Sequence, residues 1–123
     1  MQDFKYVNLN PMELNESDCV TRAIALVSKR DYFDIRRKLN LVSELLECEE
    51  LCPCCYFHLL DYVFCYERVN CRGLTVGEFA LQHPRGIYLI RMEGHISVII
   101  DGKVNDTWRC HDKIATDCWF IEN

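Results

Sequence analysis

The first half of the chain carries apolar residues at the spacing of α-helices. One set recurs at positions i, i+3, i+4 and i+7, namely Val20, Ala23, Ile24 and Val27. This spacing predicts an amphipathic helix that begins near Asp18 and places Cys19 in its first turn. The side chain available to cap this helix is Asn15, Ser17 or Asp18. The same period predicts a second helix over residues 31–39 and a third over residues 41–46.

After Pro84 the apolar period changes from that of a helix to that of a strand. Before it, residues 75–78 read Thr-Val-Gly-Glu and have the spacing of a capping box, which predicts a helix that Pro84 ends. The strands expected beyond it are residues 87–92, 95–100, 103–108 and 118–121. The first of these is apolar on both faces, as in a central strand. Asp101 and Gly102 predict a tight hairpin turn between the second and the third.

The segment between these two halves, residues 48–71, holds six of the nine cysteines. Its apolar part, residues 56–64, predicts a short helix that leads into a strand near residues 65–69. Helices that precede an antiparallel sheet are typical of an α+β fold. Because 123 residues is the length of one ordinary domain, we expect a single domain over residues 1–123, with 48–71 as a Cys-rich insertion within it.

Composition and charge argue against several classes of protein. Half of the residues are apolar, 27% are charged and the net charge is −5, which disfavours a disordered chain, a nucleic-acid binder and a membrane-surface protein. The sequence has no signal-peptide pattern and no apolar run long enough to cross a membrane. A reducing, cytoplasmic compartment is therefore expected. In such a compartment the thiols of the nine cysteines serve metal binding, catalysis or packing. Nothing in the sequence indicates an oligomeric state.

Cys19 has the position of an activated thiol. A thiol in the first turn of a helix faces unpaired backbone N–H groups and the positive end of the helix dipole, and both favour the thiolate. His95, which opens a predicted strand, is the base that could share the proton of this thiol. The alternative interpretation is that Cys19 is a small apolar residue packed in the core.

The expected hairpin register places a carboxylate next to His95. If the turn has two or four residues, side chains 95, 97, 104, 106 and 108 share one face and Asp106 lies diagonal to His95. A three-residue bulged turn would bring Asn105 to this place instead. Trp108 would cover the contact between His95 and Asp106 and keep water from it. Together with Cys19 these residues supply the nucleophile, base and orienting carboxylate of acyl transfer. The alternative is an ordinary cross-strand contact at the surface.

These residues resemble the papain-like cysteine peptidase fold in its compact versions, such as bacteriocin-leader-processing peptidases and small proteins of bacteria and their phages. The matching stretches are residues 8–11, 17–23, 94–95, 101–102 and 106–108. The triplet Asp106-Thr107-Trp108 is similar to the Asn-Ser-Trp of papain-type enzymes, and aspartate at its first position is usual in the leader-processing group. The resemblance implies a cysteine peptidase with Cys19, His95 and Asp106 as catalytic triad and Trp108 as the shield of that triad.

Two features depart from the papain pattern. Papain-like enzymes usually have a glutamine six residues before the cysteine, where its amide completes the oxyanion hole, and Glu13 stands at that place here. Asn15 or Asn10 is the candidate replacement, with the backbone N–H of Cys19 as the second donor. His95 also follows Cys19 by only 76 residues, which leaves little chain for a second lobe. A binding protein that keeps the fold without catalysis is therefore a second hypothesis.

The Cys-rich segment supports a third hypothesis, a zinc or redox module. The candidate zinc ligands are Cys48, Cys52, Cys55 and His58, of which Cys52 and Cys55 have knuckle spacing. Residues 52–55, Cys-Pro-Cys-Cys, also look like a redox dithiol, although no strand precedes them as it would in a thioredoxin-like unit. Free cysteines in a helix and loop are the favoured interpretation. We therefore expect an α+β cysteine peptidase or related amide hydrolase that acts on a peptide or protein through a thioester, with neither metal nor cofactor.

Overall fold

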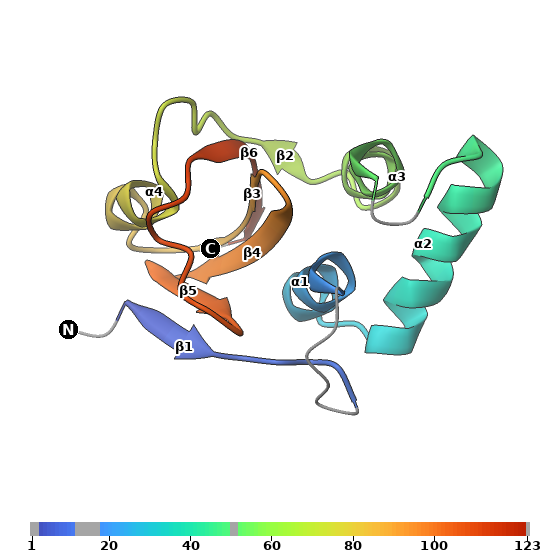
Figure 1. Cartoon of the computed structure of the whole chain (residues 1–123), viewed down its shortest axis with the longest axis horizontal. Helices are drawn as coiled ribbons and strands as arrows, with labels where there is room; N and C mark the ends of the chain where they lie inside the picture. The colour runs from blue at the N-terminus through green and yellow to red at the C-terminus, as the bar shows by residue number, and fades with distance from the viewer. Residues whose placement is uncertain (1–2, 12–17, 50–51, 123) are drawn as a thin grey trace.

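The computed structural model describes residues 3–11, 18–49 and 52–122, and Figure 1 shows how its helices and strands are arranged. In chain order they are β1 (Phe4–Tyr6), α1 (Cys19–Ser28), α2 (Tyr32–Leu46), α3 (Pro53–His58), the π-helix η1 (Leu59–Val63), β2 (Glu67–Arg68), α4 (Val76–Gln82), β3 (Ile87–Met92), β4 (His95–Ile100), β5 (Lys103–Asp106) and β6 (Ala115–Glu122). The fold class is α+β, as the sequence predicts.

The described strands form one mixed sheet in the order β1-β5-β4-β3-β6-β2. Strand β1 runs parallel to β5, with Phe4 opposite Val104, and the other neighbours are antiparallel. The expectation of a purely antiparallel sheet is therefore wrong at this edge. Three residues are too few to show a period, and their partner strand begins almost one hundred residues later, so the sequence pattern does not reveal β1.

Helices cover both faces of the sheet. Helix α1 packs against β4 and β3 on one face, and α2 and α3 lie behind it, whereas α4 lies on the opposite side of the sheet (Figure 1). The central strands therefore bury side chains on both faces: Leu89 and Val98 belong to the core on the α1 side, and Ile90 and Ile99 to the core on the α4 side. This is the pattern that a central strand was expected to show.

The helical half differs from its expected boundaries in two places. Helix α2 is continuous to Leu46 because its buried residues form one stripe that does not stop at Asn40, namely Tyr32, Ile35, Leu39 and Val42. Helix α3 begins at Pro53, earlier than expected, since proline is favoured in the first turn. It continues directly into η1, and the strand that follows has only two residues. Within the described residues, no helix has the length and apolar character to cross a membrane.

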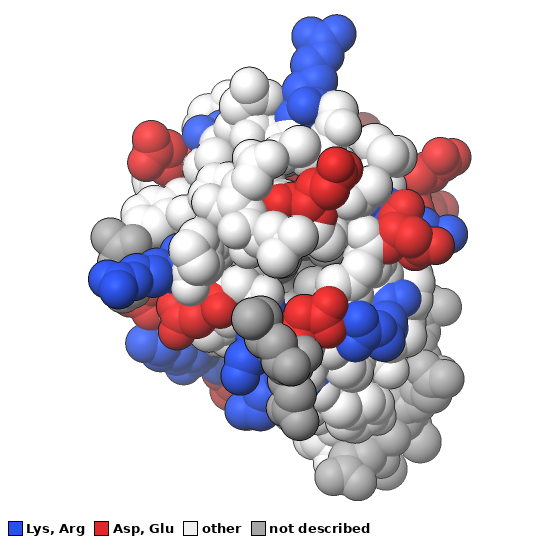
Figure 2. Space-filling model, turned by 90° about the vertical axis from the view of Figure 1, so that its left-hand side faces the viewer, with Lys and Arg blue, Asp and Glu red and all other residues white. Residues whose placement is uncertain are grey.

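The side of the molecule that carries α4, β5 and β1 has both signs of charge. Acidic and basic side chains are interspersed around a largely uncharged centre (Figure 2). In the described part of the chain, this face shows no extended patch made of basic side chains only.

The β4–β5 hairpin has the register that the sequence predicts. Asp101 and Gly102 both have positive φ, at 49° and 78°, as a two-residue type I′ turn requires. The ladder pairs Ile100 with Lys103 and continues to Val98 with Asn105. Strand β5 ends at Asp106, two residues before the expected Trp108. This register fixes where the residues after the turn lie.

Replacing Gly102 with alanine is expected to destabilise the protein more than replacing Gly94. Both glycines have positive φ, 78° and 76°, so both variants place alanine in the left-handed region, at a cost of about 1–2 kcal/mol. A Cβ at Gly102 would also lie 3.3 Å from the Ala80 carbonyl oxygen, whereas a Cβ at Gly94 meets nothing within 4 Å. Urea unfolding should show a further loss of about 1 kcal/mol for Gly102→Ala. Equal losses would show that the hairpin shifts freely away from α4.

Candidate active site

Cys19 is the first residue of α1, and its backbone N–H has no acceptor within the helix. The first helical hydrogen bond runs from Arg22 N to Asp18 O, at 3.0 Å. Asp18 occupies the N-cap position but makes no capping hydrogen bond there, and the first turn contains no acidic residue. The N–H groups of this turn therefore keep the partial positive charge of a helix N-terminus next to the Cys19 thiol.

His95 and Asp106 meet where β4 begins and β5 ends. The distance from His95 Nε2 to Asp106 Oδ2 is 2.6 Å, and the two side chains are only 9% and 7% exposed. The other carboxylate oxygen of Asp106 accepts a hydrogen bond from the Thr107 backbone N–H at 2.7 Å. The carboxylate is thus held from both sides, and Asn105 hydrogen bonds instead to the Lys103 carbonyl. A short bond of this kind fixes the plane of the imidazole ring.

The second nitrogen of His95 is directed at Cys19. A hydrogen bond joins the Cys19 and His95 side chains, and since Nε2 is engaged by Asp106, the nitrogen left for the thiol is Nδ1. The Ile96 backbone N–H also donates to the Cys19 sulfur. The fold therefore brings together Cys19, His95 and Asp106 from α1, β4 and β5 in one hydrogen-bonded row.

The electrostatics of this row favour charge separation. Burial opposes ionisation of Cys19, but the hydrogen bonds from His95 and from the Ile96 N–H outweigh it and lower the pKa of the thiol. Burial likewise opposes the charged form of His95, yet its bonds to Asp106 and Cys19 raise the pKa of His95 to about 9. For Asp106, burial is outweighed by the bond to His95, so its pKa is lowered. The arrangement favours a thiolate, an imidazolium and a carboxylate.

Trp108 lies over the imidazole ring of His95. The two ring centroids are 4.7 Å apart at an interplanar angle of 44°, and Trp108 is 41% exposed. The indole follows the end of β5 and lies between solvent and the His95 ring. It partly shields the hydrogen bond between His95 and Asp106.

The two candidate oxyanion-hole side chains have different outcomes. Asn15, like Glu13, lies outside the described residues. Asn10 is buried, and its amide nitrogen donates to Asp18 Oδ2 at 3.0 Å. The structure therefore places the Asn10 amide against Asp18, where it fixes the residue that precedes Cys19. The role of Asn10 in the oxyanion hole stays a prediction, and its contact with Asp18 is one that its position in an irregular segment does not indicate.

A buried polar cluster beneath the start of α1 has no counterpart in the sequence predictions. Asp18 accepts hydrogen bonds from Asn10 and from the Tyr32 hydroxyl, at 2.6 Å, and its other oxygen lies 3.0 Å from Arg22 Nε. Asp18 and Arg22 are only 8% and 9% exposed. The signal that could have found this cluster is the i, i+4 spacing of opposite charges on an otherwise apolar helix.

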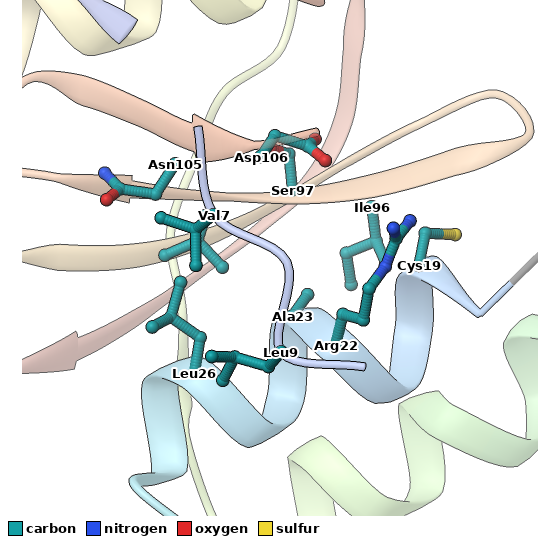
Figure 3. A pocket seen from close by; sticks show the side chains of 11 residues that line it. Val7, Leu9, Cys19, Arg22, Ala23, Leu26, Ile96, Ser97, Asn105 and Asp106 are labelled. Atoms are coloured by element: carbon teal, nitrogen blue, oxygen red, sulfur yellow. The ribbon is translucent and has the colours of Figure 1, made fainter. Parts of the chain in front are cut away.

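A small cavity adjoins the same residues (Figure 3). Residues from α1, from the chain segment after β1 and from the β4–β5 hairpin line it, among them Val7, Cys19, Arg22, Ile96, Asn105 and Asp106. In Figure 3 the guanidinium of Arg22 lies on the side of Cys19 from which the sulfur points away. The cavity measures about 20 Å³ and is lined by residues of the helix that carries the thiol and of the strands that carry His95 and Asp106.

The candidate zinc ligands are not brought together. Cys48, Cys52, Cys55 and His58 form no group of three within ligand distance among the described residues. Cys55 is buried and its thiol bonds to the Leu39 carbonyl, while the sulfur atoms of Cys52 and Cys54 are 3.0 Å apart at the surface.

One other group has the composition of a metal site. Ligand atoms of His95, Asp106 and Cys110 lie within 4.8 Å of one another. Burial raises the pKa of the Cys110 thiol to about 11, and His95 and Asp106 are already bonded to each other. Because the Cys110 thiol is neutral and the Asp106 carboxylate is already bonded to His95, these residues fit side-chain packing better than a metal centre.

Comparison of this chain with known protein families, with curated proteins and with solved structures finds no match in any of the three. The chemistry of the site is therefore argued from its own residues.

Proposed function

We propose that the protein is a cysteine hydrolase of papain-like architecture that cleaves a peptide or amide bond in a peptide or protein substrate. The observation that carries this proposal is the hydrogen-bonded row in which His95 lies between the Cys19 thiol and the Asp106 carboxylate. In this assignment Cys19 is the nucleophile, His95 is the general base and acid, and Asp106 orients the imidazole.

The first half of the reaction forms a thioester. The Cys19 thiolate attacks the carbonyl carbon of the scissile bond, a C–S bond forms, and the carbonyl oxygen becomes an oxyanion. The Cys19 backbone N–H, which has no helical acceptor, donates to that oxyanion. The imidazolium of His95 then gives its proton to the leaving nitrogen, and the C–N bond breaks.

The second half returns the enzyme to its starting state. Neutral His95 takes a proton from a water molecule, which attacks the thioester carbonyl, and the C–S bond breaks to release the carboxylic acid and the thiolate. Because acylation needs the proton of His95, the rate of hydrolysis should rise with pH as Cys19 ionises and fall as His95 deprotonates near pH 9.

Alkylation by iodoacetamide tests the thiolate directly and needs no substrate. We expect Cys19 to react below pH 7 at least about tenfold faster than any other cysteine, because its lowered pKa increases the fraction of thiolate, which is the reactive species. Mass spectrometry of peptides after brief labelling at a series of pH values identifies the modified residue. His95→Ala should abolish the selectivity, because it removes the hydrogen bond that holds the thiolate.

His58→Ala is the matched control for that substitution. His58 ends α3 and contacts Tyr62, away from the Cys19 row, so this variant should keep the selective labelling. Slow and even labelling of all nine cysteines in the wild-type protein, without a low-pH component, would instead support a binding protein that uses this fold without catalysis.

A further inference from the structure

Arg22 is one of the buried side chains in the described structure that keep a polar atom without a hydrogen-bond partner. It is 9% exposed, and its Nε forms the ion pair with Asp18 at 3.0 Å. Its Nη1 is fully buried and has no hydrogen-bond partner among the described residues. A buried guanidinium nitrogen without an acceptor is costly, because the charged donor has lost its water without replacement.

Arg22 also adjoins a space of the right size for one water molecule. Arg22 lines the cavity between α1 and the β4–β5 hairpin, which measures about 20 Å³ (Figure 3). A cavity of roughly 10–15 Å³ suffices for a single water, provided that polar groups line it. A carboxylate or phosphate needs more room and would be repelled by Asp106, which lines the same cavity.

Strand geometry supplies an acceptor on the far side of this space. The Ile96 N–H donates to the Cys19 sulfur, and within a strand the N–H and C=O of one residue point to the same edge. The pairing of β4 with β5 ends at Val98 and Asn105, so Ile96 lies beyond the last pair. The carbonyl of Ile96 is therefore directed toward the gap that Arg22 enters from α1.

We propose that one buried water molecule occupies this cavity, accepts a hydrogen bond from Arg22 Nη1 and donates to the Ile96 carbonyl. The water links the helix that carries Cys19 to the strand that carries His95. Arg22 is then a positioning residue: through the water it fixes the spacing between thiol and imidazole, and its charge stabilises the thiolate. The water itself does not depend on the proposed function, but the effect of Arg22 on reactivity does.

The charged and titratable groups around Cys19 come from four elements. His95 and Asp106 face it from the sheet, Arg22 from its own helix, and Tyr56 from α3, where the charge of Cys19 contributes to the raised pKa of that tyrosine after burial itself. Of these groups, Arg22 is the permanent cation, so its contribution to the thiolate does not change between pH 5 and 9.

A crystal structure of the wild-type protein at high resolution tests the water. An ordered peak at about 2.7–3.2 Å from Arg22 Nη1, inside the cavity, is the expected result. An empty cavity, or a direct bond from Nη1 to a protein oxygen, would overturn the proposal whatever the activity of Cys19.

The pH dependence of Cys19 alkylation tests the role of Arg22. Arg22→Met should move the midpoint to higher pH and lower the rate below it about threefold, the effect of half a pKa unit. Arg22→Lys, which keeps the charge, should restore most of the midpoint, and Arg36→Met, the same change at an exposed position of α2, should leave it unchanged. An unchanged midpoint in Arg22→Met, with Cys19 still selectively labelled, would refute this role. If the wild-type protein shows no selective labelling of Cys19, the proposed function is rejected. The presence of the water is then tested by the crystal structure alone.

Discussion

Replacing Asp106 with asparagine is expected to lower the rate of Cys19 alkylation near pH 6 by about 100-fold. The bond to Asp106 is the largest contribution that raises the pKa of His95 to about 9, from an ordinary value of 6.5. Without the carboxylate, burial disfavours the imidazolium. Each unit by which the pKa of His95 falls lowers the population of the thiolate–imidazolium pair about tenfold. Labelling at fixed pH, quenched at a series of times and followed by peptide mass spectrometry, measures the rate at Cys19 alone.

The matched control is Asp34→Asn on α2. Asp34 also interacts with basic groups, Arg30, Arg37 and Lys38, but these pairs lie at the surface and include no residue of the Cys19 row. This variant should label at the wild-type rate. If Asp106→Asn labels equally fast, the His95 imidazolium does not support the thiolate and Asp106 is only a structural partner of β4.

Replacing Asp18 with alanine is expected to reduce the free energy of unfolding by about 3–5 kcal/mol. Its carboxylate receives the Tyr32 hydroxyl and the Asn10 amide and is paired with Arg22 in a buried position. Removing one member of a buried ion pair leaves the other charged and without compensation, which costs more than the pair itself contributed. Urea unfolding followed by circular dichroism gives the free energy directly, and Asp18→Asn, which keeps an acceptor oxygen, should lose less.

Asp31→Ala provides the comparison for this second variant. Asp31 caps α2, where its carboxylate accepts from the Phe33 and Asp34 N–H groups at the surface, and losing such a cap costs about 1 kcal/mol. Both residues precede a helix, but only Asp31 makes capping bonds. An Asp18→Ala variant no less stable than Asp31→Ala would mean that Arg22 reaches solvent when its partner is removed.

The parts of the fold that were predictable are those fixed by local chemistry. The Thr75–Glu78 capping box, the Asp101–Gly102 turn and the register after it depend on residues only a few positions apart, and all appear as the sequence predicts. The position of Asp106 beside His95 follows from that register. A hairpin thus brings two of the three residues of the row together without information from the rest of the chain.

The parts that were not predictable depend on distant contacts. Strand β1 is defined by its pairing with β5, and the Asn10 amide by its contact with Asp18. The burial of Arg22 involves the segment after β1, which lies beside α1. This tertiary contact is not visible in the sequence, although the i, i+4 spacing of Asp18 and Arg22 is. Tertiary packing determines these features, and neither secondary-structure propensity nor the period of apolar residues predicts them.

The position of β5, far along the chain from α1, determines when the site can form during synthesis. Helix α1 leaves the ribosome long before β4 and β5, and β1 has no strand to pair with until β5 has followed. The nascent chain therefore carries Cys19 without His95 and Asp106, in a helix that has no sheet to pack against. Its thiol gains the row of hydrogen bonds that lowers its pKa only after residue 106 has emerged, so the growing polypeptide does not carry a thiol of lowered pKa at Cys19 before then.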